Sequence, residues 1–331
     1  MRSSDLRRRE FIALFGGVVI LRPVLVWAQQ PKPVVGFLNS RSPREAAADA
    51  HAFRDGLAES GYFDGTNVTI EYRWAEGRFD QLPRLAAELV GRQVAAIAAT
   101  GGEPSALAAK AATSTIPIVF IIGGDPIEAG LVASLNRPGG NLTGVALLLT
   151  ALEEKRLSLL RELLPGATLF AVLLNAAMPT FDTQLRHITE AVRSVAKEMH
   201  LLRVRTVEDI DAAFAKAAEI RAGALLVGTD PFMISRRDQI VALATRYAIP
   251  AMYPASEYVT AGGVMSYGTS IAAAYRQAGV HTGRILKGEK PADLPVQQSS
   301  KFEFVINLQT AKALGIEVPN SFLVQASEII E

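Results

Sequence analysis

From Pro33 onward, apolar runs of strand length alternate with longer amphipathic stretches. Strands buried on both faces read as near-continuous apolar runs, whereas helices that cover a sheet show a period of 3.6 residues. We expect strands at 34–39, 67–73, 95–100, 118–122, 169–174, 202–205, 224–227, 251–253 and 302–306. We expect helices at 42–59, 80–90, 104–112, 182–199, 208–220, 235–247 and 271–286. This order predicts an α/β fold with parallel sheets, right-handed crossovers and helices on both sheet faces.

Three landmarks of the first half return in the second half, in the same order. An asparagine ends the first strand of each half, a threonine ends or follows the third, and a proline precedes the fourth. The pairs are Asn39 and Asn175, Thr100 and Thr229, and Pro117 and Pro250. A near-constant offset predicts two similar Rossmann-like lobes rather than one large sheet.

Glycine-rich breaks indicate where the lobes end. Pro138-Gly139-Gly140-Asn141 is the strongest break in the middle of the chain, and 264–268 is the matching break after the second half. The last sixty or so residues are too few for a third domain, so we expect them to return and complete both lobes. The N-terminal lobe would comprise 33–147 and about 269–296. The C-terminal lobe would comprise 148–268 and about 297–331, joined to the first by a multi-strand hinge.

Residues 1–28 have the pattern of a secretion signal. The paired arginines in Arg7-Arg8-Arg9 precede an apolar run at 11–21, and Ala28 is a small residue at the expected cleavage site. The arginine pair resembles the signal of the twin-arginine export route. An uncleaved membrane anchor is the alternative, but the run is much shorter than the ~20 residues that a bilayer requires. We therefore expect a cleaved signal peptide and a periplasmic protein.

Charge and cysteine content narrow the function classes. The 331-residue chain has 34 basic and 33 acidic residues and no cysteine, which excludes disulfides, cysteine-ligated metals and a thiol nucleophile. Without 1–28, five arginines and two acidic residues are lost, so 303 residues remain with 29 basic and 31 acidic groups. This net charge of −2 speaks against a nucleic-acid partner.

Candidate binding residues follow from the predicted topology, because ligands of open parallel sheets bind outside the carboxyl ends of the strands. In the first lobe the candidates are Ser40, Arg41, Thr100, Gly101, Gly102 and Asp125. In the second lobe they are Asn175, Asp230, Glu257 and Tyr267.

Each candidate has a structural alternative. Ser40, Asp125 and Asp230 have the residue types of helix caps, and the last two precede a proline. Arg41 can bind a carboxylate with two hydrogen bonds or remain solvated at the surface. The Gly101-Gly102 pair allows either close backbone approach to a ligand or a tight turn.

The candidates later in the chain also have more than one possible role. Glu257 can hold an ammonium group of a ligand. Tyr253 and Tyr267 can stack on an aromatic ligand or belong to the core.

Signatures of catalysis are absent from the sequence. His51, His187, His200 and His281 lack metal-ligand spacing, and there is no nucleophile elbow, phosphate-binding loop or dinucleotide fingerprint. We expect no catalytic residues, no metal and no cofactor.

Several longer segments carry a family resemblance. They are AFRDGLAESGY at 52–62, DGTNV at 64–68, IPIVF at 116–120, DP at 125–126, GLVASL at 130–135, RPGGNLTG at 137–144, INL at 306–308, TAK at 310–312 and LGI at 314–316. Together they resemble the substrate-binding proteins of ABC transporters, in the subfamily that includes tryptophan- and tyrosine-type binders. The resemblance implies a type I periplasmic binding protein with three crossovers between two lobes. It also places the strand-end residues Ser40, Thr100, Asp125, Asn175, Asp230 and Tyr267 in the cleft.

These observations predict a monomeric, non-enzymatic receptor that delivers a small organic ligand to an ABC permease of the inner membrane. An amino acid or an aromatic carboxylate is the expected ligand. A ligand-sensing subunit of a membrane receptor and an exported enzyme are the alternatives. A transcription regulator with the same fold would need a DNA-binding segment before Pro33, where the signal pattern lies.

Overall fold

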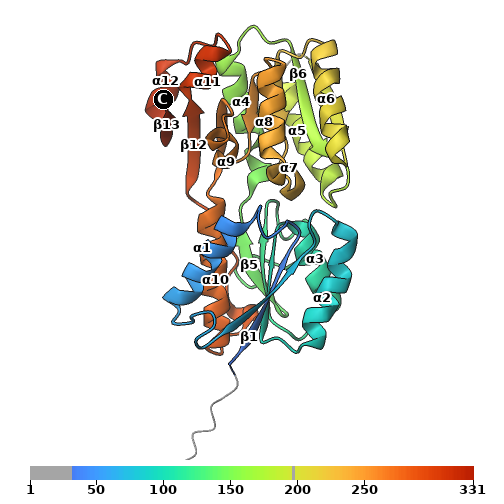
Figure 1. Ribbon diagram of the computed structural model, residues 1–331, viewed down its shortest axis with the longest axis vertical. Coiled ribbons are helices and arrows are strands. Elements are labelled where there is room, and N and C mark those ends of the chain that lie inside the picture. The colour runs from blue at the N-terminus through green and yellow to red at the C-terminus, as the bar shows by residue number, and fades with distance from the viewer. Residues whose placement is uncertain (1–31, 196–197) are drawn as a thin grey trace, which may run out of the picture. The chain divides into compact units, whose positions relative to one another are not determined.

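The computed structural model describes residues 32–195 and 198–331, and the expected signal peptide at 1–28 lies outside the described residues. The strands form two sheets (Figure 1). The first has the order β11-β5-β4-β3-β1-β2, and its neighbouring strands all run parallel. Its strands are β1 (Val34–Asn39), β2 (Thr69–Trp74), β3 (Ala96–Thr100), β4 (Ile118–Ile122), β5 (Leu142–Ala146) and β11 (Gln297–Gln298).

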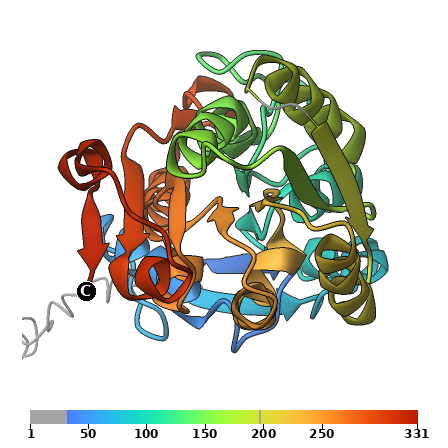
Figure 2. The same ribbon diagram turned by 90° about the horizontal axis from the view of Figure 1, so that it is seen from above.

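The second sheet is mixed rather than wholly parallel. Its order is β13-β12-β10-β9-β8-β6-β7, and β12 runs antiparallel to β10. Its strands are β6 (Leu169–Asn175), β7 (Glu198–Val204), β8 (Ala224–Val227), β9 (Ala251–Tyr253), β10 (Met265–Thr269), β12 (Phe302–Asn307) and β13 (Glu328–Ile330). Figure 2 shows the C-terminal strands, in red, at the edge of this sheet.

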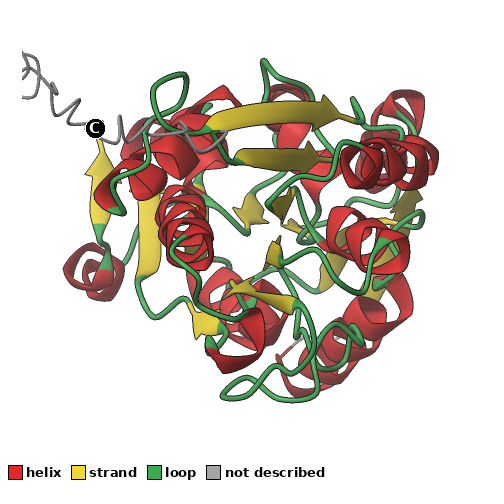
Figure 3. Ribbon diagram, turned by 90° about the horizontal axis from the view of Figure 1, so that it is seen from below, coloured by secondary structure: helices red, strands yellow, loops and turns green. Residues whose placement is uncertain are grey.

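Helices cover both faces of each sheet, as Figure 3 shows with helices in red around strands in yellow. One face of the first sheet is covered by α1 (Ala47–Glu59) and α10 (Ile271–Leu286). The other face is covered by α2 (Leu82–Gly91) and α3 (Glu103–Ala112). The helices around the second sheet are α4 (Glu153–Leu163), α5 (Phe181–Val195), α6 (Val207–Glu219), α7 (Pro231–Ser235), α8 (Arg237–Arg246), α9 (Ser256–Thr260), α11 (Leu308–Ala313) and α12 (Asn320–Gln325). Short 3-10 turns are η1 (Phe79–Gln81), η2 (Leu149–Leu152) and η3 (Pro291–Asp293). Each sheet therefore has two apolar layers, because alternate side chains of its strands point to opposite faces.

The chain passes between the two sheets three times within the described residues. It leaves the first sheet after β5, returns to it after β10 and leaves again after β11. Helix α10 and strand β11 thus belong to the first sheet although they follow most of the second in sequence (Figure 1).

Helices α1 and α10 approach each other closely through two glycines. A Cβ atom at Gly56 would overlap the Arg276 carbonyl oxygen, and one at Gly279 would overlap the Phe53 carbonyl oxygen. The absence of side chains at these positions lets the two backbones touch. This contact fixes α10 on the first sheet.

The predicted α/β class with two parallel-dominated sheets is confirmed. Several elements differ from the prediction. The helix expected from residue 42 begins at Ala47, since Ser42 and Glu45 first form a turn in which each side chain accepts from the other's backbone N–H. The helix expected over 182–199 ends at Val195, because Glu198 onward pairs with β6.

One further prediction was wrong in the second half, and the direction of one strand was not predicted. The expected break at 264–268 is strand β10, in which Gly268 allows the backbone to pack against the Pro254 carbonyl. The strand expected over 302–306 forms, but it runs antiparallel to β10, which the apolar pattern of a single run does not disclose.

Candidate functional site

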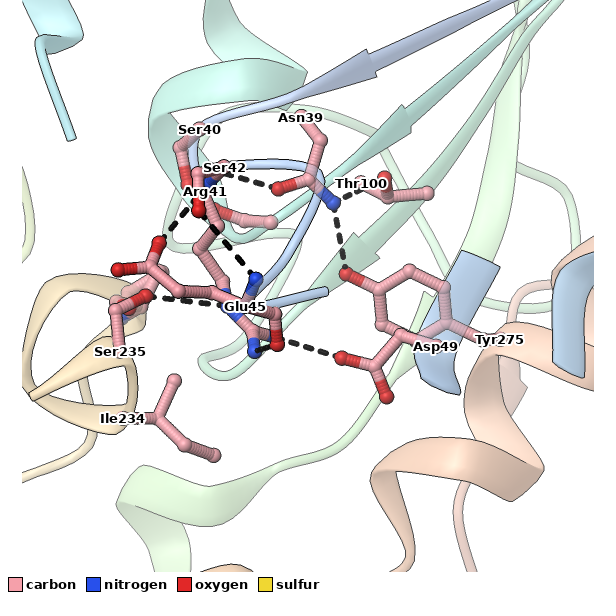
Figure 4. Close-up of polar contacts among 12 residues, drawn as sticks. Asn39, Ser40, Arg41, Ser42, Glu45, Asp49, Thr100, Ile234, Ser235 and Tyr275 are labelled. Carbon is pink, nitrogen blue, oxygen red and sulfur yellow. Dashed lines mark hydrogen bonds and ion pairs between the residues drawn. The ribbon is translucent and has the colours of Figure 1, made fainter. Parts of the chain in front are cut away.

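Asn39 ties together the elements at the carboxyl edge of the first sheet. Its side-chain Oδ1 accepts a hydrogen bond of 2.8 Å from the Arg41 N–H, which shapes the turn after β1. Its Nδ2 donates to Thr100 Oγ1 at 2.9 Å and to Tyr275 Oη at 3.1 Å (Figure 4). One buried amide therefore joins the ends of β1 and β3 to α10, as expected for parallel strands whose carboxyl ends share an edge.

Asn175 repeats this arrangement at the end of β6. Its Oδ1 accepts from the Ala177 N–H at 2.9 Å, and its Nδ2 donates to Asp230 Oδ2 at 3.0 Å. The sequence landmark shared by the two halves thus has the same local geometry in both sheets. In each case the asparagine positions a residue that follows a neighbouring strand.

A cavity lies where the carboxyl edges of both sheets meet. The space that no atom fills there is about 580 Å³, a figure that includes open solvent. Of the residues that the sequence singled out, Arg41, Gly101, Gly102 and Asp230 line it. Ser40, Thr100 and Asn175 do not line the cavity; they are buried next to residues that do. For example, Ser40 Oγ donates to the Gly101 carbonyl at 2.6 Å.

Gly101 and Gly102 serve both roles that the sequence left open. Their φ angles are +83° and +91°, in the region that favours glycine. A Cβ at Gly101 would lie 2.7 Å from Asn39 Oδ1, and one at Gly102 would lie 2.6 Å from Pro231 Cγ. The pair therefore makes the turn before α3 and brings its backbone against α7 of the second sheet.

Arg41 is neither solvated nor free. Its Nη1 donates to Asp49 Oδ2 at 2.6 Å, its Nη2 donates to the Glu45 carbonyl, and its Nε donates to Ser235 Oγ at 3.2 Å (Figure 4). The Arg41 side chain is only 7% exposed. The guanidinium is thus neutralised by Asp49 and connects the first sheet to α7.

Glu103 is a cavity residue that sequence reasoning missed. It is the first residue of α3, is almost completely buried, and its Oε1 accepts from the Gly124 N–H at 2.7 Å. Burial raises the pKa of Glu103, although backbone N–H groups of Glu103, Gly124 and Gly123 partly oppose that rise. The sequence did contain a signal for Glu103, because it is an acidic residue in the first helical turn, directly after the Gly-Gly pair at the end of a strand.

Asp230 both caps a helix and lines the cavity. Its Oδ1 accepts from the Met233 N–H at 2.7 Å at the start of α7, while Oδ2 accepts from Asn175. Burial raises the pKa of Asp230 to about 6, against the lowering effect of the Met233 and Asn175 hydrogen bonds; the nearby Glu103 contributes to the rise.

The remaining walls are mostly aliphatic. They comprise Ile121, Ile122, Leu147, Leu149, Ile234 and Ile271. Tyr275 and Thr229 add polar atoms, and Thr229 Oγ1 is buried with no hydrogen-bond partner in the described part of the chain. Such a site buries an apolar ligand body and orients it through a few polar groups.

The other sequence candidates lie apart from this cavity. Asp125 Oδ1 accepts from the Ile127 N–H at 2.7 Å within its own turn. Glu257 is the second residue of α9 and is not among the lining residues; burial raises the pKa of Glu257. Tyr267 stacks on Phe302, with ring centroids 6.2 Å apart, and lines a separate depression. Tyr253 stacks on Tyr258 in the core.

The described ranges, 32–195 and 198–331, contain neither a side-chain cluster suited to a metal ion nor a helix suited to cross a membrane. No group of three or more His, Cys, Asp or Glu side chains in them is arranged to hold a metal ion. No helix in the same ranges is long and apolar enough to cross a membrane.

Two α/β sandwiches, with a cavity where the carboxyl edges of their sheets meet, define a protein of the type I periplasmic-binding class. A family model for ABC transporter substrate binding proteins matches residues 44–330, and the chain belongs to this family. The family comprises proteins that bind small molecules and work with ABC transporters, rather than enzymes, and its members are typically exported.

Three relatives illustrate the similarity. A tyrosine-binding protein of Clostridioides difficile is 28% identical over 265 residues, which cover 80% of this chain and 76% of the relative. An ABC domain from Streptococcus pneumoniae in complex with L-Trp is 26% identical with a TM-score of 0.81, over 90% of this chain and 100% of the other. A ligand-free, open substrate binding protein from Clostridium difficile is 25% identical with a TM-score of 0.65, over 90% and 99%.

Proposed function

We propose that the protein is the periplasmic receptor of an ABC importer and binds its ligand in the cavity between the two sheets. The observation that carries this proposal is the composition of the cavity wall. Gly101, Gly102 and Glu103 come from the edge of the first sheet, whereas Asp230 and Pro231 come from the edge of the second. A ligand there touches both sides at once.

In this proposal each sheet and its helices form one lobe. The N-terminal lobe takes 33–147 with about 269–296, and the C-terminal lobe takes 148–268 with about 297–331. The three chain passages between the sheets serve as the hinge. A ligand that contacts both lobes only when they are closed shifts the open–closed population by its difference in affinity for the two states.

Two comparisons support a closed arrangement of the two lobes. The TM-score is 0.81 to the L-Trp complex and 0.65 to the ligand-free, open protein, at similar sequence identity. Direct ties between the sheets agree with this, since Arg236 Nη1 lies 3.5 Å from Glu45 Oε1 and Arg41 donates to Ser235.

The ligand, in this proposal, is an amino acid or a related small organic molecule, as for the relatives with tryptophan and tyrosine in their names. The receptor is a monomer that delivers the ligand to an inner-membrane permease after removal of residues 1–28.

A thermal-shift screen of amino acids and aromatic acids on residues 29–331 tests the proposal. We expect a rise in Tm with at least one ligand, because binding to the folded state alone stabilises it. Small-angle scattering of the same sample should show compaction with that ligand. A chain that gains no stability from any amino acid or aromatic acid, and shows no compaction, would contradict the proposed function.

A further inference from the structure

We propose that the cavity recognises its ligand through a positively charged nitrogen, placed between the carboxylates of Glu103 and Asp230, and that Arg41 binds no ligand carboxylate. This inference rests on the proposed function and names the charge of its ligand.

The first observation is that both cavity carboxylates lack a cationic partner. No ion pair to Glu103 or Asp230 occurs within the ranges that the structure describes. Their hydrogen bonds come from neutral donors, namely the backbone N–H groups of Gly124 and Met233 and the amide of Asn175. Because an unpaired buried carboxylate is costly, a ligand cation is favoured at this place.

The second observation concerns the one cationic side chain among the described residues that line the cavity. Arg41 is already paired with Asp49, and its other donors bind Glu45 and Ser235. The Arg41–Asp49 pair is neutral as a unit, so Glu103 and Asp230 leave the cavity with an excess of negative charge. A ligand carboxylate at Arg41 would have to displace Asp49, a buried partner of the same charge.

The third observation is where the two carboxylates come from. Glu103 begins α3 beside the first sheet, and Asp230 precedes α7 beside the second. A nitrogen that contacts both is bound fully only when the sheets are close together. The charge of the ligand then couples recognition to closure, since the two carboxylates also repel each other when nothing lies between them.

The unpartnered hydroxyl of Thr229 adds a polar anchor next to Asp230. The aliphatic walls described above accept the apolar remainder of the ligand. The class that fits is a primary amine on an apolar body, with or without a carboxylate.

Calorimetry on the full chain with three matched sets of probes tests the inference. The amines are tryptamine and tyramine, the acids are indole-3-propionate and 4-hydroxyphenylpropionate, and the amino acids are tryptophan and tyrosine. We expect the amines and amino acids to bind and the acids without nitrogen to show no binding. Acids that bind as well as their amine counterparts would overturn the inference and leave the proposed function standing, whereas failure of all six probes would count against both.

Charge-neutral variants locate the nitrogen. Glu103→Gln and Asp230→Asn keep side-chain size but replace one carboxylate oxygen by an NH2 group and remove the negative charge, and each should weaken amine binding by about tenfold or more. Asp125→Asn, outside the cavity, is the matched control and should bind as the unaltered chain does. Circular dichroism and Tm verify that the variants fold. Folded variants with unchanged amine affinity would overturn the assignment of the two carboxylates.

Discussion

Asp49 Oδ2 lies 2.6 Å from Arg41 Nη1, and both side chains are at most 10% exposed. The sequence left two roles open for Arg41, a contact with a ligand carboxylate and a solvated surface position, and the structure pairs it with Asp49 instead. The arginine is therefore a structural tie between β1, α1 and α7.

The first prediction concerns this pair. Arg41→Ala should lower the free energy of unfolding by about 3 kcal/mol, because it leaves the Asp49 carboxylate buried without its partner. Replacing both residues, in Arg41→Met with Asp49→Leu, should recover much of that loss. Urea denaturation of this double variant and of its component single variants, Arg41→Met and Asp49→Leu, measures the coupling energy of the pair. Losses that simply add would show that the pair is not coupled.

Ligand affinity should depend on pH through the cavity carboxylates. With the pKa of Asp230 raised to about 6 by burial, this group is ionised at pH 7.5 and mostly protonated at pH 5 in the free protein. Binding of tryptamine should therefore weaken by about tenfold between these pH values, since a ligand cation must displace the proton. Glu103, whose pKa burial also raises, acts in the same direction.

Asp230→Asn tests the origin of that dependence. Calorimetry at pH 7.5 and pH 5 should show a flatter profile for this variant, alongside its weaker binding. A variant that keeps the full tenfold change would assign the titration to another group.

Stability should fall in mild acid because of His281. Its imidazole is fully buried on α10, neither ring nitrogen has a hydrogen-bond partner among the residues that the structure describes, and burial lowers the pKa of His281 to about 4. A lowered histidine pKa favours the neutral folded form, so its contribution is fully present above about pH 6.5 and is lost as pH falls toward 4. This linkage costs about 2 kcal/mol at pH 5 relative to pH 8.

His281→Leu removes the titrating group at similar size. Chemical denaturation gives the free energy of unfolding at pH 8 and at pH 5. Its decrease between these pH values should be about 2 kcal/mol smaller in this variant than in the unaltered chain. Equal losses in the two proteins would exclude His281 as the source.

The contact between α1 and α10 allows a packing test. Gly279→Ala should destabilise the fold by about 1–3 kcal/mol, because its Cβ overlaps the Phe53 carbonyl and forces the helices apart. Gly91→Ala is the control, since nothing lies within 4 Å of a Cβ there and alanine favours the helix. Urea denaturation of both variants decides the matter, and a Gly279→Ala protein as stable as the control would contradict the close approach.

The local apolar pattern was enough to predict the bounds of several strands and of one helix. The apolar runs of β1, β4, β8 and β9 and the amphipathic helix α10 have the predicted bounds. Features that depend on pairing with distant strands were not predicted. Glu198 and Met199 continue a helical pattern but pair with β6, and the direction of β12 depends on its contact with β10.

Candidate residues show the same division. The strand-end rule identified Arg41, Gly101, Gly102 and Asp230 as cavity residues, because topology places the carboxyl edges there. The neutralisation of Arg41 by Asp49 was not predictable, since it depends on where α1 lies. Tyr275 reaches Asn39 across 236 positions of sequence, a distance over which no local pattern carries information.

The late pairing of the strands after Val296 has a consequence for folding during synthesis. Strand β11 completes one edge of the first sheet, while β12 and β13 complete one edge of the second. The first sheet lacks a strand until Gln298 has emerged, and the second lacks one until Ile330 has emerged, so earlier strands leave an unpaired edge exposed meanwhile. Such late, non-local pairing slows folding and exposes the nascent chain to aggregation.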